Sequence, residues 1–335
     1  MRVAAVFTTV FLSFASVSAA AEVQLTGAGA TFPYPIYGKW FNEYHKLKSD
    51  VQINYQSIGS GGGIRQLTAG TVDFGASDKP MSNEEMAQLK VKPLHVPTVL
   101  GAVVPAYNLP GYSKELKLSQ DALAGIFLGT IKKWNDPVLG KDNPGLPDQE
   151  IVVVHRSDGS GTTFVFTDYL AKVSPEFKSK VGTNNSVKFP VGLGAKGNEG
   201  VTGLIKQTPN SIGYIELVFA LQNKIAYAAM KNSSGVYVKA DLASVTAAAA
   251  GAAKAMPDDF RVSITDPPGK GAYPISSFTW LLVPSQIPDA AKRQVLVEFL
   301  GWMLKDGQKM ATDLGFAPLP KEVLAKELKA IAMVK

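Results

Sequence analysis

Short apolar runs alternate with helical stretches along most of the chain, and this alternation is typical of α/β layers. Compact or alternating runs predict strands at residues 51–55, 72–76, 96–104, 151–154, 211–215 and 279–283. Spaced apolar residues predict helices at residues 36–47, 82–89, 164–170, 294–303 and 321–331. The Ala-rich segment 243–255 fits either a helix or a soft connector.

The length of the chain predicts more than one domain. Without the first residues, about 310 residues remain, which is more than a single hydrophobic core of usual size supports. From Asp258 onward the sequence looks like a return crossing. We therefore predict a first lobe that starts with residues 22–102, a second lobe of residues 103–262, and a C-terminal part, residues 263–335, that rejoins the first lobe.

Residues 1–21 have the pattern of a cleaved signal peptide. Met1-Arg2 is a short positive region, residues 3–14 are mostly apolar, and small residues follow up to Ala21. This order predicts cleavage between Ala20 and Glu22 and export to the periplasm. The apolar run is shorter than the roughly 20 residues that span a bilayer, which argues against a membrane anchor.

Composition excludes several classes of site. The chain has no Cys, which rules out disulfides, thiolate metal sites, a Cys nucleophile and a lipid anchor, and its three His make a His-rich metal site improbable. We expect no metal and no cofactor. The formal charge of +6 falls to +5 when Arg2 leaves with the signal peptide. Basic residues are scattered, so we expect no nucleic-acid partner.

Three small, hydroxyl- or Gly-rich turns precede predicted helices. They are residues 27–33, residues 58–63 and residues 156–163, the last of which begins with Arg156. The first turn of a helix has unpaired N–H groups and the positive end of the dipole, so an oxyanion can bind there. One such turn is usually only a helix cap, whereas three in one chain favour an anion site. None has the P-loop spacing, which argues against a nucleotide.

Asp78 follows directly on a predicted strand. By itself it fits a helix cap or a partner for Lys79. An ionised carboxylate only accepts hydrogen bonds, so beside a bound anion it would need a ligand that still carries a proton. Phosphate near neutral pH has such a proton and sulfate has none. Asp78 therefore favours phosphate over sulfate, molybdate or another fully ionised oxyanion.

Several motifs closely resemble the family of periplasmic phosphate-binding proteins of phosphate-specific ABC transporters. The resemblance runs in the same order through nearly the whole mature chain. Its strongest matches are residues 25–33 (LTGAGATFP), 58–63 (IGSGGG), 72–78 (VDFGASD) and 158–162 (DGSGT), with further matches at 126–134, 164–167, 192–200 and 212–214.

This resemblance implies a fold and a set of ligands. The fold is the α/β type II periplasmic binding protein, with two lobes joined by two crossing strands and the ligand between them. The implied partners are inorganic phosphate and the membrane permease subunits, and we expect a monomer. The implied phosphate ligands are Thr31, Phe32, Ser60, Asp78, Arg156, Ser160, Gly161 and Thr162, with Asp158 orienting Arg156. Gly61 departs from the family, where we would expect a second Ser.

An enzyme is the alternative from another class. A serine hydrolase built on Ser160 would need a base, and His155 is the nearest His in sequence. The segment around Ser160 lacks the first Gly of the Gly-x-Ser-x-Gly elbow, and His155 fits a structural role better. A phosphatase would need metal ligands or a nucleophile that the sequence does not offer. We therefore expect a binding protein rather than an enzyme.

Overall fold

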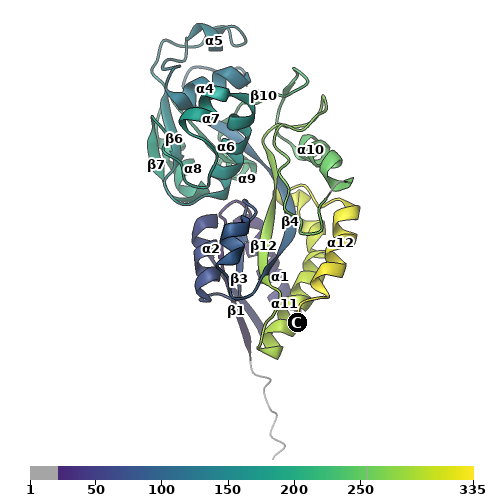
Figure 1. Ribbon diagram of the computed structural model, residues 1–335. Coiled ribbons are helices and arrows are strands. Elements are labelled where there is room, and N and C mark those ends of the chain that lie inside the picture. Colours follow the sequence, from purple (N-terminus) through teal and green to yellow (C-terminus); the bar gives the residue numbers. More distant parts are fainter. Residues whose placement is uncertain (1–21, 255) are drawn as a thin grey trace, which may run out of the picture.

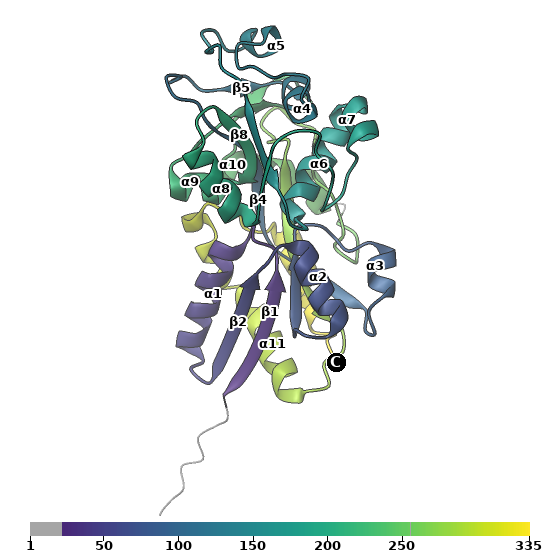
Figure 2. The same ribbon diagram turned by 90° about the vertical axis from the view of Figure 1, so that its left-hand side faces the viewer.

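The computed structural model describes residues 22–254 and 256–335, so the predicted signal peptide lies outside the described residues. Two lobes are stacked along one long sheet (Figures 1 and 2). Within the described residues, nine strands form this sheet in the order β2-β1-β3-β12-β4-β8-β6-β7, with β9 beside β4. These strands are β1 (Val23–Gly29), β2 (Val51–Ser57), β3 (Phe74–Ser77), β4 (Pro93–Asn108), β6 (Val152–Arg156), β7 (Leu193–Ala195), β8 (Ser211–Glu216), β9 (Ala226–Tyr227) and β12 (Ser276–Pro284).

The first lobe contains the parallel strands β2, β1 and β3, followed by the antiparallel β12 and the first half of β4. Figure 1 places α2 on one side of these strands and α1 and α11 on the other. The helix α1 buries Tyr37, Trp40, Phe41 and Tyr44, whose spacing puts them on one face. Tyr44 meets Phe299 of α11 edge-on, with ring centroids 5.2 Å apart. The helical elements of this lobe are α1 (Tyr34–Leu47), α2 (Ser60–Ala69), α3 (Asn83–Ala87), α11 (Ala290–Met303), α12 (Lys321–Ile331), η1 (Gly307–Met310) and η2 (Thr312–Leu314).

The second lobe is built on β8, β6, β7 and the second half of β4, with helices on both faces (Figure 2). Its core is aromatic: Phe166 stacks on Tyr214 at 4.2 Å and meets Phe127 edge-on at 4.7 Å. Its helices are α4 (Gln120–Leu128), α5 (Pro137–Gly140), α6 (Gly161–Val173), α7 (Pro175–Lys180), α8 (Gly197–Gln207) and α9 (Leu217–Asn223). A small sheet adds β5 (Lys117–Leu118), β10 (Ala229–Lys231) and β11 (Tyr237–Val238).

The strand β4 joins the two lobes. It pairs with β12 from Pro93 to Ala102 and with β8 from Val103 to Asn108. The chain returns through α10 (Leu242–Lys254) and residues 256–275, which contact both lobes. Arg261 donates to the Met81 carbonyl at 3.0 Å, and Lys172 donates to the Thr265 hydroxyl at 2.6 Å. The predicted lobe boundaries at residues 102 and 262 stay a prediction.

The structure confirms the predicted strands and helices and shifts several of their ends. The Ala-rich segment is a helix, α10, and the helix predicted at 82–89 is shorter, covering Asn83–Ala87. Sequence reasoning missed β1 as a strand. No helix among the described residues is long and apolar enough to cross a membrane.

One predicted turn is wrong. Residues 61–63 were expected to precede a helix, but α2 begins at Ser60 and includes them. A side chain at Gly63 would lie 2.5 Å from the Ala28 carbonyl oxygen. The Gly run therefore lets the first turn of α2 pack directly against the backbone of β1.

Candidate functional site

The first lobe brings its predicted residues together at the carboxyl ends of three parallel strands. Thr31 and Phe32 lie between β1 and α1, Ser60 starts α2 after β2, and Asp78 follows β3. All four are buried. Loops at the carboxyl ends of neighbouring parallel strands meet at one edge of the sheet, which is where α/β proteins usually bind ligands.

The second lobe contributes an ion pair whose cation, Arg156, is buried. Arg156 ends β6, and its guanidinium donates from Nε to Asp158 Oδ1 at 2.7 Å and from Nη2 to Asp158 Oδ2 at 2.5 Å. Asp158 also accepts the Gly197 N–H at 3.1 Å. Burial acts to raise the pKa of Asp158, but hydrogen bonds and charge from Arg156 outweigh it, and the pKa lies below its ordinary value. The two hydrogen bonds to Asp158 hold the guanidinium in one orientation.

The opening of α6 faces the first lobe. Ser160 caps this helix, with its Oγ accepting the Thr163 N–H at 3.0 Å. The next N–H group, that of Gly161, crosses to the first lobe and donates to Ser60 Oγ at 3.0 Å. A Cβ on Gly161 would lie 2.6 Å from Asp78 Oδ2, so this carboxylate oxygen sits directly against the helix opening.

Asp78 is a buried carboxyl with one oxygen engaged. Its Oδ1 accepts the Thr279 hydroxyl at 2.8 Å, and its own N–H donates to Ser60 Oγ at 3.2 Å. Burial raises the pKa of Asp78 to about 7, although hydrogen bonds from Thr279 and Ser60 and the charge of Arg156 act to lower it. The pair with Lys79 considered from the sequence does not form, because Lys79 binds Glu85 instead.

The lobes also touch through backbone and side-chain contacts around these residues. The Gly61 N–H donates to the Gly159 carbonyl at 2.8 Å. A Cβ at Gly61 would lie 3.1 Å from the Gly159 Cα. The glycine in place of the expected Ser therefore coincides with a close approach of two backbone segments. Residues around Ser60, Asp78 and Gly161 therefore bring the two lobes into direct contact.

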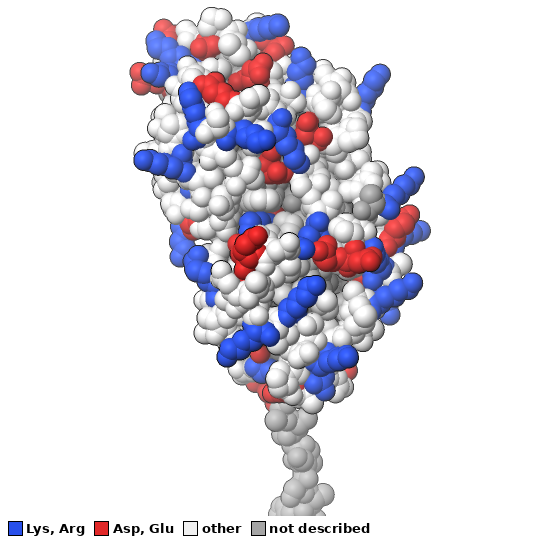
Figure 3. Space-filling view, in the orientation of Figure 1, with Lys and Arg blue, Asp and Glu red and all other residues white. Residues whose placement is uncertain are grey.

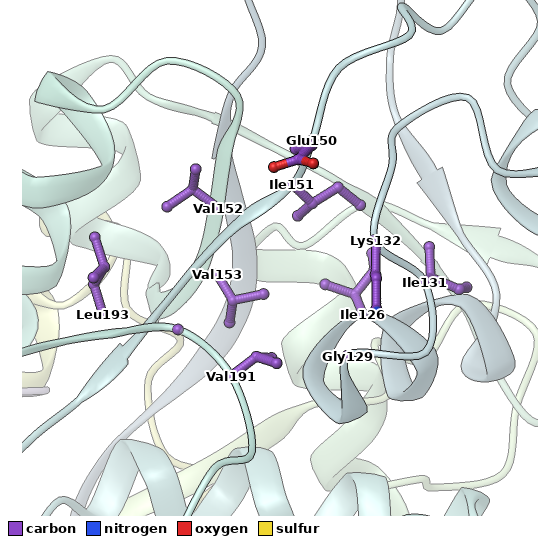
Figure 4. A pocket seen from close by; sticks show the side chains of 11 residues that line it. Ile126, Gly129, Ile131, Lys132, Glu150, Ile151, Val152, Val153, Val191 and Leu193 are labelled. Atoms are coloured by element: carbon purple, nitrogen blue, oxygen red, sulfur yellow. The ribbon is translucent and has the colours of Figure 1, made fainter.

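The region where the lobes meet differs in its residues from a hollow in the second lobe. A cavity of about 400 Å³ in the second lobe is lined mainly by aliphatic side chains, with Lys132 and Glu150 at its edge (Figure 4). On the face shown in Figure 3, positive and negative side chains are interspersed. Arg156, by contrast, is a buried cation.

Comparisons with known proteins agree with this geometry. Residues 15–306 match the family model described as a PBP superfamily domain. The chain is 46% identical over 312 residues to the phosphate-binding protein PstS of Xylella fastidiosa strain Temecula1, which covers 92% of this chain and 85% of that relative. It is 47% identical over 305 residues to PstS of Pasteurella multocida, covering 90% of this chain and 88% of the relative.

The chain belongs to the PstS family. A solved phosphate-binding protein from Stenotrophomonas maltophilia has the same fold, with a TM-score of 0.71 at 20% identity over 92% of this chain and 94% of that one. The two-lobed α/β fold predicted from the resemblance is confirmed. The members of the PstS family are substrate-binding proteins.

In this PstS family member, the residues that a hydrolase would use are engaged with other partners. The His155 ring stacks on Phe189, with centroids 4.9 Å apart, and its Nδ1 lies 3.0 Å from the Arg156 carbonyl oxygen. The Ser160 hydroxyl is engaged as a helix cap. Among the described residues, no group of three or more His, Cys, Asp or Glu could hold a metal ion.

Two residues at the site were missed by sequence reasoning. Thr279 binds Asp78 from 201 residues away, and nothing in the local sequence marks it. Asn198, fully buried at the start of α8, binds Thr31 and Thr162. Asn198 lies in the matched stretch 192–200, so the resemblance pointed to this segment without assigning it a role.

Proposed function

We propose that this chain binds inorganic phosphate between its lobes and delivers it to the permease of a phosphate ABC transporter. The observation that carries the proposal is the meeting of Arg156 and the opening of α6 with Asp78, a buried carboxyl that has one oxygen directed at the same place. Such a site can hold an oxyanion and can also accept a hydrogen bond from an O–H group of that anion. The names of the PstS relatives support phosphate as that anion.

Donors to the anion come from both lobes. The guanidinium of Arg156 supplies a charge-assisted donor, and the first N–H groups of α6 add oriented donors with the positive end of the helix dipole. Thr31, Phe32, Ser60, Ser160, Gly161 and Thr162 complete the proposed set of ligands, and Asp158 fixes Arg156.

Asp78 supplies the selection for a protonated ligand. Phosphate near neutral pH carries an O–H that can donate to Asp78 Oδ2. Sulfate has no proton, so two acceptors would face each other in a buried place, which is costly because neither can recover its hydration. Sites built around a particular hydrogen can reject an analogue that lacks it by about 10⁴-fold.

Binding is coupled to the arrangement of the lobes because the ligands come from both. A phosphate ion held at once by the first and the second lobe favours the form in which they are close together. We propose that the permease recognises this form, that the protein acts as a periplasmic monomer after cleavage between Ala20 and Glu22, and that it is not an enzyme. The lobes would then comprise residues 22–102 with 263–335, and residues 103–262.

Calorimetric titration tests which anion the mature protein binds. The protein is first freed of phosphate by unfolding and refolding. We expect tight binding of phosphate, competition by arsenate, which is also protonated near neutral pH, and near exclusion of sulfate. Small-angle scattering of the same samples should show a smaller radius of gyration with phosphate. Absence of phosphate binding by folded protein would overturn the proposed function.

A further inference from the structure

Asn198 of the second lobe hydrogen-bonds to residues of both lobes and to the end of β8. Its backbone N–H and its side-chain Nδ2 donate to Thr31 Oγ1 of the first lobe at 3.1 and 2.8 Å. The same Nδ2 donates to Thr162 Oγ1 of the second lobe at 3.1 Å. Both threonines belong to the proposed phosphate site, and Asn198 is fully buried.

The orientation of the amide is set by Glu216. The Glu216 N–H donates to Asn198 Oδ1 at 3.0 Å, so the oxygen of the amide faces Glu216 and the nitrogen faces the threonines. The reverse orientation would place two N–H donors against each other. Glu216 pairs with Val103 in the ladder between β8 and β4, at the point where β4 passes into the second lobe.

These contacts determine whether two hydroxyl groups act as hydrogen-bond donors or acceptors toward a ligand. A hydroxyl has one proton to donate and two lone pairs that accept. The lone pairs of Thr31 Oγ1 receive two N–H groups, both from Asn198. Those of Thr162 Oγ1 receive Asn198 Nδ2 and, at 3.4 Å, Arg156 Nη1. Each hydroxyl is left with its O–H proton as its remaining hydrogen-bonding capacity, and this proton can only be given to an acceptor.

We propose that Asn198 is a positioning residue that turns the hydroxyl protons of Thr31 and Thr162 toward the bound anion. Because Asn198 and Thr162 both belong to the second lobe, the Thr162 proton is fixed within that lobe, whereas the Thr31 proton is fixed only when the lobes are together. The inference rests on the proposed phosphate function and explains why these two hydroxyl groups act as hydrogen-bond donors to the anion. An acceptor in place of the amide nitrogen would compete with the ligand for both protons.

Asn198→Asp tests this directly, since it keeps the shape and replaces the donor by an acceptor. We expect phosphate affinity to fall at least about tenfold, as for the loss of one or more hydrogen bonds to a charged group. Asn223→Asp serves as control for the added charge, because Asn223 lies at the end of α9 and donates to the Phe219 carbonyl. We expect it to bind phosphate as wild type does. Circular dichroism and thermal unfolding would confirm that each variant is folded.

A double-mutant cycle with Thr31→Val separates hydroxyl orientation from simple charge repulsion. In the wild-type background Thr31→Val should cost affinity, whereas in the Asn198→Asp background it should cost little, because the hydroxyl proton is already directed away from phosphate. Equal costs in both backgrounds, or an Asn198→Asp protein that binds as wild type does, would overturn the inference.

A second background covers the case in which Asn198→Asp does not fold. Asn198→Ala removes the side-chain donor without adding charge, and the same cycle with Thr31→Val should again show coupling. Additive losses there would refute the role of Asn198. Failure of the wild-type protein itself to bind phosphate would instead refute the proposed function, so the two failures are distinguishable.

Discussion

The two lobes place carboxylates in very different surroundings at the same site. The second lobe clamps Asp158 onto Arg156 by two hydrogen bonds, and the pKa of Asp158 falls. The first lobe buries Asp78 against the Thr279 hydroxyl, and its pKa rises to about 7. One carboxylate therefore serves to fix a positive charge, and the other is free to exchange a hydrogen bond with a ligand. Under the proposed function, the attraction of the anion and the selection for its proton are supplied by separate lobes.

Removing the cation of the second lobe should have the largest effect. Arg156→Ala loses the buried charge-assisted donor, a loss that costs about 2–5 kcal/mol in binding, and leaves the partly exposed Asp158 without its partner. We expect phosphate affinity to fall about 10³-fold or more while the fold persists. Arg293→Ala is a control, because Arg293 binds the Ile287 carbonyl away from the site. Wild-type affinity in folded Arg156→Ala protein would place the site elsewhere.

A methyl group at Gly161 tests whether the two lobes must meet. Alanine is favoured within a helix, so Gly161→Ala should leave α6 intact. Its Cβ would however lie 2.6 Å from Asp78 Oδ2 in the other lobe. We expect about a 100-fold loss of phosphate affinity, as for overpacking of a buried site by a few kcal/mol, and no compaction in small-angle scattering. Gly203→Ala, where nothing lies within 4 Å of an added Cβ, is the matched control. Tight binding by Gly161→Ala would contradict the close approach.

Neutralising the first lobe's carboxylate should mainly change selectivity. Asp78→Asn keeps the size and adds an N–H donor, so a fully ionised oxyanion no longer meets an opposing acceptor. We expect sulfate to bind measurably and the ratio of phosphate to sulfate affinity to narrow by at least about tenfold. Competition titrations of wild type and variant at pH 8 measure this ratio. If the variant excludes sulfate as strongly as wild type, the discrimination arises from the size and donor geometry of the site.

The raised pKa of Asp78 also predicts a pH-dependent effect on the free energy of unfolding. Because the folded-state pKa of about 7 lies above the ordinary 3.8, the folded protein binds more protons than the unfolded chain between these values. The contribution of Asp78 to stability is fully present below pH 3.8 and is lost as the pH rises through about 7. Phosphate-free Asp78→Asn should thus gain stability over wild type by roughly 2–4 kcal/mol at pH 8 and less at pH 5. Urea unfolding at both values measures it, and an equal difference at both would show that ionisation of Asp78 is not the cause.

The sequence allowed much of this arrangement to be anticipated. The alternation of strands and helices predicted the α/β layers, and the sequence placed Ser60 and Asp78 after predicted strands, whereas the strand before Thr31 was missed. Local sequence patterns could not reveal the hydrogen-bonding partners that only tertiary folding brings to the site. Thr279 reaches Asp78 from the far end of the chain, and Asn198 acquires its role only when Thr31 and Thr162 lie on either side of it. The helical start at Ser60 was misjudged because close packing on β1 overrides the low helix propensity of glycine.

The position of β12 has a consequence for the order in which the chain can fold. Its residues Ser276–Pro284 lie between β3 and β4, strands that are synthesised some two hundred residues earlier. Strand pairings that close such long loops are slow to form. The strands that pair within the second lobe all precede residue 239, so that lobe can complete its sheets while the first still waits for its central strand. During synthesis, Arg156 would therefore lie in a paired sheet early. Thr279, which hydrogen-bonds to Asp78, would be added only near the end.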